Sequence, residues 1–174
     1  MKYKIIKKQN NTARCFICGL SNVAGVQMKY YNCENESGEK VLLGIINPKD
    51  EHQSYPNRMH GGVAAAILDE SIGRAFWLER EEWGVTMDLH TRYRKPTPLD
   101  RPLYVEGKLT KVSSRGFDAE GKLFYIDDDG NEVVSVTGTG RYLILPIEQI
   151  SGEQIDSENW FYEEEELPKY LEIK

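Results

Sequence analysis

The sequence predicts a single domain of the α+β class, in which one long helix packs against a strongly curved antiparallel sheet. The helix is expected at about residues 62–80, and segments with strand patterns lie on both sides of it. One helix set against a run of antiparallel strands is typical of this class. The chain has 174 residues, which is the usual size of one domain with its own core.

Alternation of apolar and polar residues predicts the strands of this sheet. Turn-forming stretches separate them, and the clearest is Asp127-Asp-Asp-Gly-Asn131 between the last two. We therefore expect a sheet of about five to six strands wrapped around the helix. The strands are expected at about residues 26–31, 41–46, 85–94, 103–112, 117–126 and 133–145.

The predicted helix begins with an apolar segment that is followed by two carboxylates. From Val63 to Leu68 it offers no polar side chain, so its first two turns should be buried nearly all round. Asp69 and its neighbour Glu70 come next. An acidic pair of this kind often marks the point where a helix reaches solvent. Here, however, two glycines stand at the helix start and leave its N–H groups open to a ligand oxygen.

A carboxylate and open backbone N–H groups suit acyl transfer from a thioester. The N–H of Gly61 or Gly62 would stabilise the carbonyl oxygen as it becomes an oxyanion. The Asp69 carboxylate would activate water or attack the carbonyl directly. The leaving group is a thiolate whose parent thiol has a pKa of about 8.5, so no strong general acid is needed.

Within one chain these groups are too far apart to serve one carbonyl. At about 1.5 Å per residue, Asp69 lies roughly 10–12 Å along the helix from the two glycines. Two chains with antiparallel helices would bring Asp69 of one chain to the glycines of the other. We therefore expect a homodimer with composite sites, and assembly into a homotetramer stays open.

Three segments of the chain follow the order of a known family. They are residues 15–25 (CFICGLSNVAG), 60–73 (HGGVAAAILDESIG) and 84–96 (GVTMDLHTRYRKP). Together they resemble the hotdog-fold acyl-CoA thioesterases of the phenylacetate-pathway and 4-hydroxybenzoyl-CoA types, over roughly residues 15–146. The resemblance implies the hotdog fold, in which the sheet wraps around a central helix, and it implies acyl-CoA as the substrate.

The resemblance also implies roles for single residues. Asp69 would be the general base or nucleophile, and the Gly61 amide would hold the thioester oxygen. Thr86 would help to place the attacking water, and His60 would shape the loop or orient the thioester. The candidates for substrate binding, mostly for the nucleotide part of coenzyme A, are Gly62, Asn57, Arg92, Arg94, Lys111, Arg115 and Gly116. Asn57 lies closer to His60 than the family pattern has it.

Charge and composition indicate the setting of the domain. A net charge of −6 argues against nucleic acid or an anionic membrane as a partner. We expect neither a secretory signal nor a membrane span. Three cysteines fit a reducing compartment, so we expect a cytoplasmic protein. The chain divides into an N-terminal leader (1–24), the domain (25–146) and an acidic tail (147–174), whose glutamate run at 163–166 is typical of a solvated surface.

We expect hydrolysis to need neither a metal nor a cofactor. Three alternatives to this interpretation stay open. A hotdog enoyl-CoA hydratase or dehydratase would pair His60 with Asp69. A non-catalytic acyl-CoA-binding protein would have no need of a buried carboxylate. A zinc site is possible by count, although the spacing is irregular, with the ligands Cys15, Cys18, Cys33 and His52.

Overall fold

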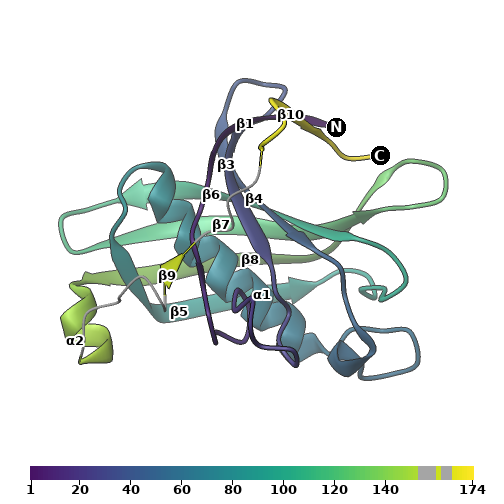
Figure 1. Cartoon of the computed structure of the whole chain (residues 1–174), viewed down its shortest axis with the longest axis horizontal. Coiled ribbons are helices and arrows are strands. Elements are labelled where there is room, and N and C mark those ends of the chain that lie inside the picture. The colour runs from purple at the N-terminus through teal and green to yellow at the C-terminus, as the bar shows by residue number, and fades with distance from the viewer. Residues whose placement is uncertain (153–159, 162–165) are drawn as a thin grey trace.

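One antiparallel sheet of eight strands curves around a single long helix (Figure 1). The computed structural model describes residues 1–152, 160–161 and 166–174, so most of the predicted glutamate run lies outside the described residues. The strand order across the sheet is β10-β1-β3-β4-β6-β7-β8-β5. The strands are β1 (Lys2–Lys8), β3 (Lys29–Glu34), β4 (Lys40–Ile46), β5 (Trp83–Tyr93), β6 (Leu103–Val112), β7 (Gly116–Ile126), β8 (Glu132–Leu145) and β10 (Tyr170–Glu172).

The long helix α1 (Gly61–Arg74) continues into a 3-10 turn, η2 (Ala75–Leu78). The α-helix is therefore shorter than the predicted span of 62–80, because the chain tightens at Ala75 and turns Phe76 into the core. The shorter elements are η1 (Asp50–His52), α2 (Ile147–Ser151) and the two-stranded pair of β2 (Asn11–Thr12) with β9 (Trp160–Phe161).

The predicted number of strands was too low, since the sheet has eight strands and not five to six. The two added strands are β1, which lies within the predicted leader, and β10, which lies within the predicted tail. In β1 the single fully buried apolar side chain is Tyr3, which packs in a cluster with Tyr31 and Phe124. A lysine-rich strand with one such anchor carries almost no period-2 signal.

A row of glycines lets α1 lie close to the sheet. Gly107, Gly121 and Gly138 are register partners on β6, β7 and β8. A Cβ atom on Gly121 or on Gly138 would come to 3.1 or 3.0 Å from the side chain of Ile72 on the helix. Because Ile72 and Leu68 are fully buried above this row, the missing side chains set the distance between helix and sheet.

The apolar start of α1 is only partly covered, so the prediction of burial all round was wrong. Ala64 and Leu68 are buried, but Gly62 is exposed and Val63 is half-buried. The strand beside this part of the helix, β5, lies at the end of the sheet and exposes most of its side chains. A single chain therefore leaves one side of its central helix open.

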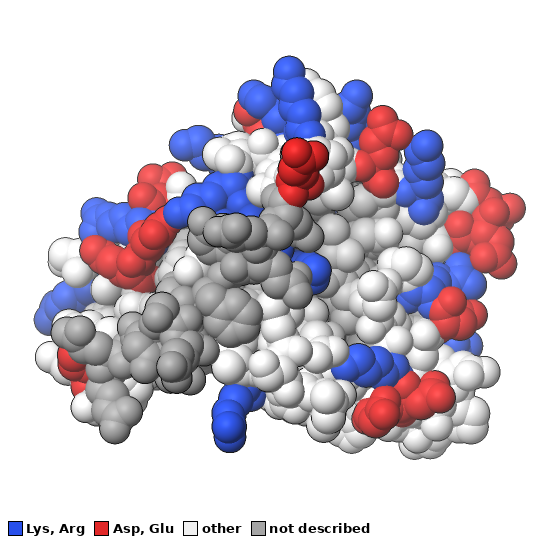
Figure 2. Space-filling model, viewed as in Figure 1, with Lys and Arg blue, Asp and Glu red and all other residues white. Residues whose placement is uncertain are grey.

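Charged side chains of both signs cover one face of the molecule. On the face drawn in Figure 2, positive and negative side chains are interspersed and not gathered by sign. Within the described residues, none of the helices has the length and apolar character needed to cross a membrane.

Candidate active site

Asp69 lies where three elements of the fold meet. Its side chain leaves α1 half-buried, and its Oδ1 atom accepts a hydrogen bond of 2.8 Å from the Thr86 hydroxyl on β5. The Tyr142 hydroxyl on β8 donates to the Asp69 backbone carbonyl at 2.9 Å and to Oδ1 at 3.3 Å. Thr86 and Tyr142 are register partners beside an irregularity in the β5–β8 ladder. The predicted pair of Asp69 and Thr86 is therefore in direct contact.

Tyr142 is the residue of this group that sequence reasoning missed. Its side chain is 2% exposed and stacks on Phe117 at 4.9 Å, and Phe117 in turn stacks on Phe76 at 4.4 Å. Burial, and then the Asp69 carboxylate, raise the pKa of the Tyr142 hydroxyl well above its usual value. The hydroxyl therefore stays protonated and acts as a donor.

Thr86 and Tyr142 occupy only one of the two oxygens of the Asp69 carboxylate. In the described part of the chain, Oδ2 has no hydrogen-bond partner, whereas Oδ1 has two. The carboxylate lines a hollow of about 210 Å³ together with Thr86 and Tyr142. One oxygen is thus oriented by the protein, and the other is available to water or a substrate.

The start of α1 separates the roles of the two glycines. His60 caps the helix, and its Nδ1 atom accepts a hydrogen bond of 2.9 Å from the Gly62 N–H. The Gly62 amide is therefore already used. The Gly61 N–H stands at the first helical position, where no intrahelical acceptor exists, and the Gly61 carbonyl accepts from the Tyr93 hydroxyl at 2.7 Å.

The Gly61 amide and the Asp69 carboxylate belong to different hollows. Gly61 lines a hollow of about 440 Å³ that also has Arg58, Arg94 and Lys95 on its wall. Arg94 was predicted as a binding residue, whereas Arg58 and Lys95 were not. His60, at the same end of α1, lies about as far from Asp69 as Gly61 does, so one chain does not form the pair that a hydratase would need.

The predicted coenzyme A residues do not converge in one place. Lys111, Arg115 and Gly116 line a hollow of about 360 Å³ that shares Tyr142 with the Asp69 hollow. Arg92 and Arg94 lie on a broader groove of about 950 Å³ that is lined by β5, β6, β7 and β8. Asn57 is in the loop before the helix, with a φ of +57° and its N–H bonded to Gln53.

The Asp69 hollow has a second wall, formed by Cys15, Cys18, Glu70 and Arg74. A hydrogen bond from Cys18 lowers the pKa of the Cys15 thiol to about 6, and the same contact together with burial raises the pKa of Cys18. The zinc set considered from the sequence does not form. Cys33 packs in a different cluster with Tyr31, and the His52 Nδ1 atom accepts from the backbone of its own 3-10 turn.

Known proteins match both the sequence and the fold. Residues 57–131 match the family model described as the thioesterase superfamily. The crystal structure of a thioesterase superfamily protein has a TM-score of 0.61 and 30% identity, over 74% of this chain and 59% of that chain. A Bacillus halodurans protein, crystallised with CoA, is 24% identical with a TM-score of 0.52, over 64% of this chain and 71% of its own, and shares the fold.

A curated relative matches at lower identity. An uncharacterised protein of Schizosaccharomyces pombe is 25% identical over 115 residues, which are 66% of this chain and 65% of that protein. This chain thus spans less than two thirds of that relative and of the first crystal structure. The match over residues 57–131 and the helix wrapped by an antiparallel sheet confirm the resemblance found in the sequence. Residues 57–131 of this chain are thus similar to the thioesterase superfamily, within a chain of hotdog architecture.

Proposed function

We propose that this protein hydrolyses an acyl-CoA thioester to a free acid and coenzyme A. One observation supports the proposal above the others: the Asp69 carboxylate, which lines a hollow, is oriented through Oδ1 by two hydroxyls, while Oδ2 has no hydrogen-bond partner in the described part of the chain. A carboxylate held in this way can accept a proton from water as the water attacks the carbonyl. It can also attack directly, with water then cleaving the mixed anhydride.

The oxyanion donor in this proposal is the Gly61 amide of a second copy. Two hydrogen bonds between α1 and β5 favour this arrangement, namely Thr86 with Asp69 and Tyr93 with Gly61. If two β5 strands pair antiparallel about a point between Leu89 and His90, Thr86 of one chain lies opposite Tyr93 of the other. Each Asp69 is thereby brought toward the partner's Gly61, and the homodimer holds two composite sites.

The phosphate groups of coenzyme A need a basic hollow close to Asp69. The hollow with Lys111 and Arg115 shares the lining residue Tyr142 with the Asp69 hollow, so the two hollows are neighbours, and in this proposal the pantetheine arm extends from one to the other. We propose that Lys111 and Arg115 bind phosphate groups of coenzyme A there. The CoA bound in the Bacillus halodurans structure is a property of that protein, and it makes CoA the first ligand to test. All three cysteines are free thiols, which fits the cytoplasmic location that we propose.

An acyl-CoA panel tests reaction class and substrate together. Release of free thiol is measured with the wild-type chain, with Asp69→Asn and with Glu82→Gln, a control that removes another carboxylate on the same hollow. We expect Asp69→Asn to lower kcat by on the order of 10²–10⁴ while the fold is kept, and the control to stay near wild type. Equal thiol release by Asp69→Asn would overturn the proposal. Loss of an enoyl double bond without thiol release would favour the hydratase, and binding without turnover would favour the acyl-CoA-binding protein.

Mixed dimers test whether the sites are composite. An Asp69→Asn chain and a Gly61→Val chain are each expected to be inactive alone. After they are unfolded and refolded together, half of the dimers contain one chain of each kind, and each of these dimers has one intact site. The mixture should therefore regain about one quarter of the wild-type activity. No recovery, with dimers verified by mass, would place both groups in sites within a single chain.

A further inference from the structure

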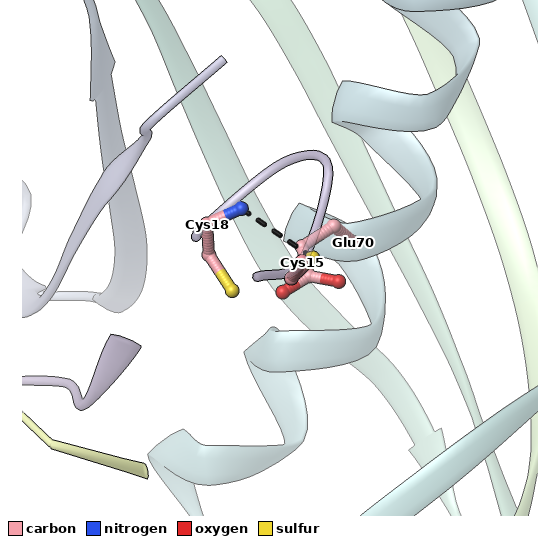
Figure 3. A group of neighbouring side chains, drawn as sticks. All are labelled: Cys15, Cys18 and Glu70. Carbon is pink, nitrogen blue, oxygen red and sulfur yellow. Dashed lines mark hydrogen bonds between the residues drawn. The ribbon is translucent and has the colours of Figure 1, made fainter. Parts of the chain in front are cut away.

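A second group of reactive side chains faces the Asp69 hollow, and the proposed hydrolysis does not use it. Cys15 and Cys18 come from the loop after β2, and Glu70 comes from α1, directly after Asp69. One ligand atom from each of these residues lies within 4.8 Å of the other two (Figure 3). Two sulfurs and a carboxylate oxygen from separate elements therefore share one small space.

The cysteine loop is built to present both sulfur atoms to this space. The Cys15 Sγ atom accepts backbone N–H groups from Ile17 at 3.3 Å and from Cys18 at 3.5 Å. A Cβ atom on Gly19 would come to 2.3 Å from the Cys15 carbonyl, so the turn closes only with glycine there. The buried side chain of Asn11 donates to the Cys18 carbonyl at 2.7 Å and fixes the end of the turn. Amide donors to sulfur stabilise a thiolate, which is the form that binds a metal.

Charge at the group fits a divalent cation. Metal binding requires both thiols to ionise, and two thiolates and one carboxylate carry three negative charges, which a partly buried space holds only with cations beside them. The Arg74 guanidinium is one of these, since it donates to Glu70 at 2.8 Å and to the Cys18 sulfur at 3.1 Å. It contacts two of the three side chains and neutralises one charge. A divalent ion would neutralise the other two.

We propose that Cys15, Cys18 and Glu70 bind a zinc ion, with a fourth coordination position directed to the Asp69 hollow. Thiolate sulfur selects zinc over magnesium and calcium, and a carboxylate is a regular third ligand. In a tetrahedral site with zinc–sulfur bonds of about 2.3 Å and a zinc–oxygen bond of about 2.1 Å, ligand atoms lie about 3.6–3.8 Å apart. The three atoms would thus have to close by at most about 1.2 Å.

The ion would tie the N-terminal loop to the helix at the residue beside Asp69. In the described chain, Arg74 already links the two through Glu70 and Cys18, together with a bond of 2.9 Å to the Asn10 carbonyl. Zinc would add direct bonds across the same junction. Its effect is expected on the stability of the loop and on the shape of the hollow wall, whichever reaction the hollow serves.

Metal binding by the full chain tests this proposal without any activity assay. The reduced wild-type protein is freed of metal, titrated with Zn²⁺ and analysed for bound metal, and Co²⁺ is used as a spectroscopic substitute. We expect one ion per chain and a thiolate-to-cobalt charge-transfer band of the intensity given by two sulfurs. Cys15→Ser should lose most of this band, and Glu70→Gln should keep it but bind at least tenfold more weakly. Cys33→Ser is the matched control, because Cys33 lies in a separate cluster and its loss should change neither result.

The wild-type spectrum keeps the proposal falsifiable even if a variant does not fold. Wild-type protein that binds less than a tenth of an ion per chain at saturating Zn²⁺ would overturn the proposal. The same holds if cobalt binds without a thiolate band, or if Cys33→Ser loses binding as Cys15→Ser does. A Cys15–Cys18 disulfide that forms on purification and persists under reducing conditions would also overturn it, since the pair would then serve as a redox couple.

Discussion

The Tyr142 hydroxyl shares its one proton between two oxygens of Asp69, the backbone carbonyl at 2.9 Å and the carboxylate Oδ1 at 3.3 Å. One buried side chain thus fixes both the helix backbone and the proposed catalytic group. The aromatic stack with Phe117 and Phe76 holds the ring in place, so the position of the carboxylate depends on the core as well as on the helix.

Removing this hydroxyl should affect both activity and stability. We expect Tyr142→Phe to lower kcat about tenfold, which corresponds to about 1.4 kcal/mol for an orienting hydrogen bond. The free energy of unfolding should fall by about 1 kcal/mol. Thiol-release kinetics and urea unfolding measure the two effects. Tyr104→Phe, which removes a hydroxyl from the cluster on the other face of the sheet, should leave kcat unchanged. An equal loss in both variants would contradict the assignment.

The raised pKa of Tyr142 predicts how stability changes at alkaline pH. Its hydroxyl stays protonated in the folded chain, while in the unfolded chain it ionises near pH 10. A raised folded pKa contributes stability that is present below pH 10 and is lost as pH rises toward the folded value. The wild-type chain should therefore lose stability above about pH 10 more steeply than Tyr142→Phe. Parallel unfolding curves of the two proteins from pH 8 to pH 11 would contradict this.

Charge reversal distinguishes the basic hollows. We expect Lys111→Glu and Arg115→Glu to raise the KM for acyl-CoA with little change in kcat, and the effect should be larger at low salt. Lys40→Glu, a reversal on an exposed β4 lysine, is the control for net charge. A rise in KM for Arg58→Glu and Lys95→Glu alone would move the phosphate site to the hollow beside Gly61.

Cys15 and Cys33 should be alkylated at different rates in the metal-free chain. Cys15 is half-buried with a pKa of about 6, whereas burial raises the pKa of Cys33 to about 12. At pH 7 iodoacetamide should therefore modify Cys15 first, and its rate should fall as pH drops below about 6 because the thiolate becomes protonated. Peptide mapping by mass spectrometry gives the order. Preferential modification of Cys33 would be inconsistent with the described burial.

Substitution in the glycine row tests what positions the helix. In Gly121→Ala the new Cβ would meet Ile72 at 3.1 Å and the Glu106 carbonyl at 3.0 Å, so we expect a loss of about 1–3 kcal/mol. In Gly107→Ala the nearest atom would be 3.4 Å away, and the cost should be smaller. Thermal unfolding compares the two variants. Equal stability of both would show that the helix shifts without cost.

Periodic elements were predictable from the sequence, and long-range partners were not. The helix start and six of the strands have local apolar patterns that gave their positions within a few residues. The strand β1 was missed because it is rich in lysine and buries only one apolar side chain, that of Tyr3, so it shows no clear alternation of apolar and polar residues. Tyr142 carries no local signal either, since its role comes from a contact with Asp69 that spans 73 residues. Asp69 and Thr86 could be expected at one site because the family resemblance implied a role for each of them.

The exposed edge of β5 affects the stability of the chain when it is not part of a dimer. Within the described sheet, its outer edge carries unpaired backbone groups over 11 residues, with Val85 and Met87 open to solvent. An open apolar edge of this length is a template for any extended segment, including one from an unfolding neighbour. We therefore expect dilution to lower the melting temperature, because it raises the fraction of chains whose β5 edge is open, so that the working stability of this protein would depend on its own concentration.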